Sequence, residues 1–381
     1  MSPIARFMIW ARSAPVEERI QATATLVEAW RSSGLSASDR MLAVTAMIGL
    51  LDDPSAEVRH ALAEAVAHLE DAPRTVILGL AQEAGEAAEL VLARSPLLSD
   101  AELVDAVAVG NPRLQAAAAV RESVSPALAA AIGEVGGRLA CLCLLRNRGA
   151  RLTRLTFERV AERFGEHADI REALLAREDL PVGLRHALVK SFTGALKAAF
   201  VGRGELAAER AERAVFEACE KATLAIAAGS AAPRTAALVQ HLRSSGDLTA
   251  SLLLRAALSG QVGFVGEAFA QLAGVPAARV AHIVCAPESF GFAALYKRAG
   301  LPAQAFGAFV AALEMRFEAG ADPERPWRLS PAAVAHVAAV CAYETDLDGL
   351  MMLLRRFELE VAREAMREEH ETIAAHAVIA A

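Results

Sequence analysis

The chain has 381 residues, of which 54% are hydrophobic but only 5% aromatic, and its formal net charge is -7. An acidic chain does not offer the general basic face that neutralises phosphates, so we expect no nucleic acid among its partners. Apolar content supplied mostly by Ala, Leu and Val favours helices. No window is apolar and uncharged for long enough to cross a membrane, and we expect no membrane span.

Residues 1–51 are predicted to form helices, and one sequence pattern then recurs five times between residues 58 and 177. In this pattern, an apolar residue is followed seven positions later by a basic or small one. The five copies start at Val58, Ala87, Leu114, Leu139 and Ile170. Such a period indicates stacked two-helix units that cover each other's apolar faces. We therefore predict an all-α fold that begins with a HEAT-like α-solenoid of about five two-helix repeats.

Helix-start signals recur with nearly the same period. They lie at Asp71-Ala72-Pro73, Ser99-Asp100, Ser125-Pro126, Thr153 and Leu180-Pro181. At the head of the first repeat we expect Asp53 to cap the following helix and Pro54 to occupy its first turn.

The sequence predicts three parts: a HEAT-like repeat domain over 1–195, a connecting helix and linker over 196–233, and a C-terminal all-helical domain over 234–381. The best linker candidate is Gly229–Pro233. In the last part, the Gly-x-Pro sequences at 274–276 and 300–302 predict corners between helices, because glycine ends one helix and proline begins the next.

The final helix is predicted from about residue 346 to 378. Its apolar residues give about two heptads of seam, which predicts a homodimer through this helix. The seam residues are Leu347, Leu350, Leu354, Phe357 and Val361.

Four segments together resemble a known family: LDDPSAEVR (51–59), SPLLSDAELV (95–104), LLAREDLP (174–181) and SGDLTASLLLRAA (245–257). They are similar to an alphaproteobacterial family catalogued as domain-of-unknown-function family 2336, over most of the chain. The resemblance implies a cytoplasmic helical-repeat protein, and it supplies no catalytic residues. The short second elements also resemble those of leucine-rich-repeat-variant solenoids.

Four arginines recur at one repeat position and are expected to stack into a ridge: Arg94, Arg121, Arg146 and Arg177. Each is expected near the C-terminus of a helix, where a cation is favoured by the helix dipole and can bond unpaired carbonyls. The alternative is a basic strip that binds an acidic or phosphorylated partner.

No cluster amounts to a reaction centre, and we predict neither catalytic residues nor a cofactor. Glu57, His60, Glu64 and His68 have the spacing of a metal site, but the helical projection turns His60 and Glu64 toward solvent. His370-Glu371 and His376 are spaced too widely for the zinc motif HExxH. We therefore predict no metal.

Five scattered cysteines form neither a disulfide framework nor a metal knuckle, and are interpreted as buried thiols of a reducing, cytoplasmic compartment. The leading hypothesis is a non-enzymatic scaffold or adaptor, in which the repeats present an extended face to a protein or peptide partner. Two alternatives stay open: an enzyme or nucleic-acid repair module on a HEAT-like scaffold, and a sensor that binds an apolar small ligand in its C-terminal domain.

Overall fold

The computed structural model describes residues 3–11, 13–32, 34–83, 85–202, 207–315, 325–342 and 348–379. These residues form α-helices and one short 3-10 helix, with no strand among them, so the predicted all-α class is confirmed. The other regular feature is an isolated β-bridge between Val124 and Ala150. In the part of the chain just defined, no helix combines the length and apolar character needed to cross a membrane.

The chain divides into two compact units, Met1–Pro181 and Val182–Ala381. The sequence places the end of the repeat domain later, at 195. The difference arises at α13 (Val182–Gly202), which packs against α14 (Ala208–Ala228) and α15 (Ala232–Ser245) of the second unit. The segment interpreted as a linker, Gly229–Pro233, contains the short turn between α14 and α15.

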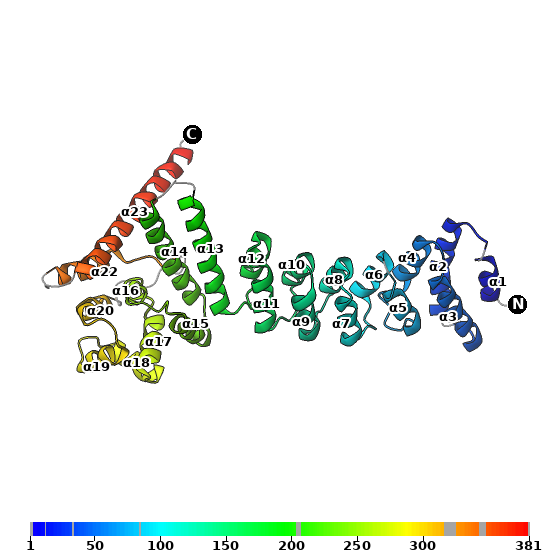
Figure 1. Ribbon diagram of the computed structural model, residues 1–381, viewed down its shortest axis with the longest axis horizontal. Coiled ribbons are helices and arrows are strands. Elements are labelled where there is room, and N and C mark those ends of the chain that lie inside the picture. The colour runs from blue at the N-terminus through cyan, green and yellow to red at the C-terminus, as the bar shows by residue number, and fades with distance from the viewer. Residues whose placement is uncertain are drawn as a thin grey trace. The chain divides into compact units, whose positions relative to one another are not determined.

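The helices of the first unit lie in two rows (Figure 1). We call them row A and row B. Row A contains α2 (Val16–Arg31), α4 (Ala56–Val66), α6 (Glu86–Arg94), α8 (Pro112–Ala119), α10 (Arg138–Arg146) and α12 (Ala168–Leu175). Row B contains α1 (Pro3–Trp10), α3 (Ala37–Leu51), α5 (Arg74–Ala81), α7 (Asp100–Ala108), α9 (Pro126–Val135) and α11 (Arg154–Phe164).

Each helix of row A packs on the next one. Row B is continuous from α1 to α5 and again from α7 to α11, but α5 and α7 make little contact. The two rows pair in chain order from α3 with α4 to α11 with α12. This arrangement is compatible with the predicted solenoid of about five two-helix repeats.

Local signals explain where these helices begin. Ser99 caps α7 in a capping box with Glu102, Ser125 caps α9, and Thr153 caps α11. Helices also start directly after Pro73 and Pro181, so all five predicted starts are confirmed.

The expectation for Asp53 and Pro54 is wrong. Helix α4 begins at Ala56 with Ser55 as its N-cap residue. The Asp53 carboxylate instead accepts the Ser55 amide hydrogen at 2.9 Å and pairs with Arg19 of α2 at 3.0 Å. Asp53 therefore links the turn before α4 to α2, the neighbouring helix of row A, because its carboxylate is bonded to Arg19 instead of capping α4.

The second unit surrounds α16 (Ala250–Leu258), whose residues from Leu252 onward are all buried. Helix α16 packs against α14, α17 (Val262–Ala273) and α20 (Phe306–Glu314). The unit also contains α18 (Ala277–Val284), α19 (Phe290–Ala299), the 3-10 helix η1 (Ala303–Ala305), α22 (Pro331–Cys341) and α23 (Asp348–Ile379). Aromatic rings of α17, α19 and α20 pack edge to face, with Phe269 and Phe309 6.0 Å apart. Gly274 and Gly300 end α17 and α19 at φ values of 63° and 71°, which confirms both predicted Gly-x-Pro corners.

Candidate binding surface

The four predicted arginines lie at the C-terminal ends of consecutive row A helices. Arg94 and Arg146 are the last residues of α6 and α10, whereas Arg121 and Arg177 follow α8 and α12. They do not form one uniform ridge, because their guanidinium groups have two different environments.

Arg121 and Arg177 reach back to the preceding helix of row A. Arg121 donates to the carbonyls of Leu92 and Ser95 at 2.5 and 2.8 Å, at the end of α6. Arg177 donates to the carbonyls of Leu145, Asn147 and Ala150 at the end of α10, and pairs with Asp179 at 2.7 Å. Each guanidinium thus satisfies carbonyls that the helix leaves unpaired. Burial lowers the pKa of Arg121, which is consistent with this enclosed position.

Arg94 and Arg146 are exposed, and neither forms a hydrogen bond or ion pair within the described residues. At the end of α8, the bonds that Arg146 could make are made by its neighbour. The Asn147 side-chain amide donates to the carbonyls of Ala119 and Arg121 at 2.9 and 2.7 Å. Arg146 is therefore left without a structural role at that helix end.

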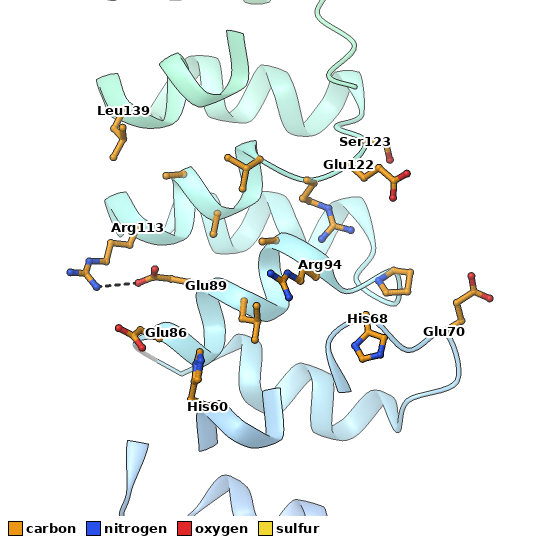
Figure 2. Close-up of a pocket in the computed structure, with 17 residues that line it drawn as sticks. His60, His68, Glu70, Glu86, Glu89, Arg94, Arg113, Glu122, Ser123 and Leu139 are labelled. Carbon is orange, nitrogen blue, oxygen red and sulfur yellow. Dashed lines mark ion pairs between the residues drawn. The ribbon is translucent and has the colours of Figure 1, made fainter. Parts of the chain in front are cut away.

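Arg94 and Arg121, from consecutive repeats, line one open hollow of about 1170 Å³ on row A, called the first hollow below. Figure 2 shows the Arg94 side chain extending into it and Arg113 paired with Glu89 at 3.6 Å. The other charged or imidazole-bearing lining residues are His60, His68, Glu70, Glu86 and Glu122. The lining thus carries both signs of charge and is not a basic cradle.

Arg146 and Arg177, from the next two repeats, line a second, smaller hollow of about 620 Å³. Its other charged residues are Arg148, Glu172, Glu178 and Asp179. Arg148 is exposed and adds a second unpaired cation beside Arg146 among the described residues. The sequence did not single out Arg148, because the repeat pattern has no counterpart for it. No Phe, Tyr or Trp lines either hollow.

Within the described residues, the other candidates are not brought together into a metal site. His60 lies 3.6 Å from Glu64 on α4 and lines the first hollow together with His68. No group of three or more potential ligands is placed to hold a metal within the described residues. The structure does not describe the side chains of Glu371 and His376.

All five cysteines are free thiols. Cys141 and Cys341 are buried, and burial raises the pKa of Cys141 to about 11. Cys285 is exposed, which differs from the expectation that these thiols are buried.

The predicted seam of the final helix packs inside the second unit. Leu354 and Phe357 are fully buried, and Leu350 and Val361 pack against the same core; Leu347 lies outside the described residues. The seam is therefore an intramolecular contact, and the exposed apolar residues of α23 lie on its opposite face. Among the side chains that the structure describes, they are Met352, Leu359, Met366 and Ile373.

A buried ionic cluster, which the sequence did not reveal, attaches α23 to the unit. Arg255 of α16 donates to Glu220 of α14 at 2.9 Å and to both carboxylate oxygens of Glu360 of α23 at 2.9 Å. Lys221 also pairs with Glu360, at 2.7 Å. Burial raises the pKa of Glu220, whereas hydrogen bonds from Arg255 outweigh burial at Glu360 and lower its pKa. Each carboxylate in the cluster is paired with a basic side chain from another helix, so the cluster attaches α23 to α14 and α16.

Known proteins give one comparison. A family model described as "Uncharacterised protein conserved in bacteria (DUF2336)" matches residues 87–345, which include the four arginines of row A. No curated protein and no solved structure matches the chain. Because the match covers more than half of the residues, the chain belongs to the bacterial family DUF2336.

Proposed function

We propose that the protein is a non-enzymatic scaffold or adaptor that binds a polypeptide partner along row A. The observation that carries the proposal is that only two of the four arginines bond to the fold. Arg121 and Arg177 bond to carbonyls of the fold, whereas Arg94 and Arg146 line neighbouring hollows and, among the described residues, form no hydrogen bond or ion pair. Unpaired cations at the ends of rigidly held helices are suited to recognise carboxylates on another chain.

The spacing of the two free arginines favours an extended partner segment. Arg94 ends α6 and Arg146 ends α10, with α8 between them in row A. Packed helices lie about 8–10 Å apart, so the two positions are roughly 20 Å apart. A strand-like segment covers this distance in about six residues.

The charges of the hollows define the partner more narrowly than a general polyanion. Glu86 and Glu122 line the same hollow as Arg94, and Glu172 and Glu178 line the same hollow as Arg146; none of the four has an ion pair within the described residues. We therefore propose a segment that places acidic or phosphorylated side chains at the arginines and basic ones between them. The same acids would repel a nucleic-acid backbone, and the hollows offer no aromatic ring for base stacking, so the repair-module alternative is less favoured.

We place this function in the bacterial cytoplasm. The support is the bacterial family and the five free cysteines, because thiols persist in reducing compartments.

The scaffold proposal is tested by affinity purification from a bacterial host, comparing wild type with Arg94→Glu/Arg146→Glu. The matched control is Arg210→Glu/Arg279→Glu, which makes the same change in net charge on two exposed arginines of α14 and α18 that form no side-chain hydrogen bond or ion pair within the described residues. We expect partners that wild type and the control retain and that the row A variant loses. Identical partners for all three proteins would overturn the proposal.

A second observation favours pairing of two copies through α23. Met352, Leu359, Met366 and Ile373 are 66%, 50%, 59% and 59% exposed and lie one heptad apart. Residues at this spacing form one stripe, which supplies one of the two apolar positions per heptad through which helices pair. The charged residues Arg355 and Glu369 lie between successive apolar residues of the stripe, so we propose a weak, concentration-dependent dimer.

The charges beside the stripe favour a parallel orientation. Projected at 100° per residue, Glu358 lies on one flank of the stripe and Arg363 and Arg367 on the other. In a parallel pair the acidic flank of each helix faces the basic flank of the other, with Glu358 opposite Arg363 of the second copy. An antiparallel pair would bring the two basic flanks together.

A further inference from the structure

The interruption of row B between α5 and α7 creates an apolar hollow on the first unit. The two helices are joined at one end only. Arg74, the first residue of α5, donates to the carbonyl of Leu97 and to the Glu102 carboxylate of α7 at 2.7 Å. The C-terminal ends of α5 and α7 have no such bond among the described residues, and the hollow opens there.

The hollow has a volume of about 410 Å³ and an apolar interior. Its floor consists of leucines from the core, and its walls are short or branched apolar side chains of α5 and α7. The floor and wall residues are Leu92, Leu98, Leu114, Leu78, Ala81, Ala106 and Val109. Ligand sites in proteins are commonly about 300–1,000 Å³, so the space suits a small molecule. Val109 is 81% exposed at the mouth.

Negative charge gathers around the mouth. Glu83 and Asp105 line it, together with the C-terminal ends of α5 and α7, which carry the negative end of the helix dipole. Glu83 is engaged by Arg59, and Glu102, at the joined end of the hollow, is engaged by Arg74. Asp105 is exposed and has no hydrogen bond or ion pair within the described residues. An apolar interior with an unpaired carboxylate at its mouth is complementary to an amphiphilic cation.

We infer that the hollow between α5 and α7 binds a small amphiphilic amine, with its apolar body on the leucine floor and its ammonium group at Asp105. The site is separate from the arginine surface of row A and does not depend on the scaffold function. It lies in the first unit, unlike the apolar ligand site that the sequence suggested for the C-terminal domain.

The test uses three straight-chain probes of eight carbons each: n-octylammonium, octanol and octanoate. Binding to the full-length chain is followed by NMR of ¹³C-labelled Leu and Val methyl groups. We expect n-octylammonium to shift signals of Leu78, Leu98 and Val109 and to bind at least about ten-fold more tightly than octanoate, because Asp105 repels the carboxylate. Equal affinities for the three probes, or shifts spread over both units, would contradict the site.

Two variants separate the charge from the space. Asp105→Asn changes an exposed side chain and should remove most of the preference for n-octylammonium over octanol. Ala106→Phe should fill the hollow and abolish binding of all three probes. Ala108→Phe is its control, because Ala108 is an exposed residue of the same helix that does not line the hollow. Unchanged binding to folded Ala106→Phe would place the probes elsewhere and overturn the inference.

Discussion

Arginine at one repeat position serves two purposes, and the neighbouring helix end determines which. Arg121 and Arg177 meet unpaired carbonyls of the preceding row A helix. Beside Arg146, Asn147 already occupies the carbonyls at the end of α8. The sequence identifies all four positions, because the repeat places them at helix ends. It cannot assign their bonds, because these depend on residues about 30 positions away.

The two roles predict opposite results for one substitution. Arg121→Met removes two charge-assisted hydrogen bonds to carbonyls at the end of α6 and should lower the free energy of unfolding by about 2 kcal/mol. Arg94→Met removes no hydrogen bond or ion pair among the described residues and should change the free energy of unfolding by less than about 0.5 kcal/mol. Urea unfolding followed by circular dichroism measures both values. Equal losses for the two variants would contradict the division of roles.

His186 predicts how the second unit responds to acid. Burial lowers the pKa of His186 to about 4, while Asp247 raises it and His241 and Lys190 lower it further. An unfolded histidine has a pKa near 6.5, so below that pH the unfolded chain binds a proton that the folded chain does not bind. The contribution of His186 to the free energy of unfolding is therefore fully present above pH 6.5 and is lost as the pH drops toward 4.

At pH 5 the loss from His186 should be about 2 kcal/mol relative to pH 7. We expect His186→Gln to reduce the difference between urea unfolding free energies at pH 7 and pH 5 by about that amount. The control is His336→Gln, which changes a partly exposed histidine of the same unit. The same pH dependence in wild type and His186→Gln would show that His186 is not responsible.

At the scale of helices, local capping signals are the main reason that the helix starts could be predicted. Ser99, Ser125 and Thr153 mark helix starts because each side chain accepts an amide hydrogen only three residues away. Asp53 was misassigned because its partner Arg19 is 34 residues distant. The seam of α23 was assigned to a second copy because a heptad pattern does not identify which surface covers it.

The buried cluster around Arg255 should hold α23 in place. Arg255→Met leaves the carboxylates of Glu220 and Glu360 buried without their main partner, which costs about 3–5 kcal/mol. Arg356→Met is the matched control, because it breaks the partly exposed pair of α23 with Glu217 of α14, which is worth less than about 1 kcal/mol. Hydrogen exchange over residues 348–370 measures the attachment of α23. Equal protection in the two variants would refute this role of Arg255.

At the scale of the whole molecule, composition and periodicity are sufficient for the all-α class and the stacked helix pairs. They are not sufficient for the division into units. The sequence extended the repeats to 195, because the helix start at Leu180-Pro181 continues the period. The structure assigns α13 to the second unit, because its apolar residues find their neighbours on α14 and α15. Sequence alone could not supply the gap between α5 and α7, which arises from a packing irregularity.

Pairing through α23 predicts self-association that depends on concentration. Leu359→Glu/Met366→Glu places charge in the middle of the exposed stripe and should leave the chain monomeric. Phe290→Glu changes an apolar residue that is 91% exposed elsewhere in the unit and should leave association unchanged. Sedimentation velocity over a range of concentrations measures the outcome. A dimer that persists in the double variant would exclude this face.

The scaffold function is tested most directly by titrating a purified partner against the full-length chain by calorimetry. We expect Arg94→Glu/Arg146→Glu to raise the dissociation constant at least about ten-fold, whereas Arg210→Glu/Arg279→Glu should leave it within about two-fold. Circular dichroism must show that both variants are folded. Equal affinity of the row A variant and wild type for this partner would contradict the claim that row A is the binding surface.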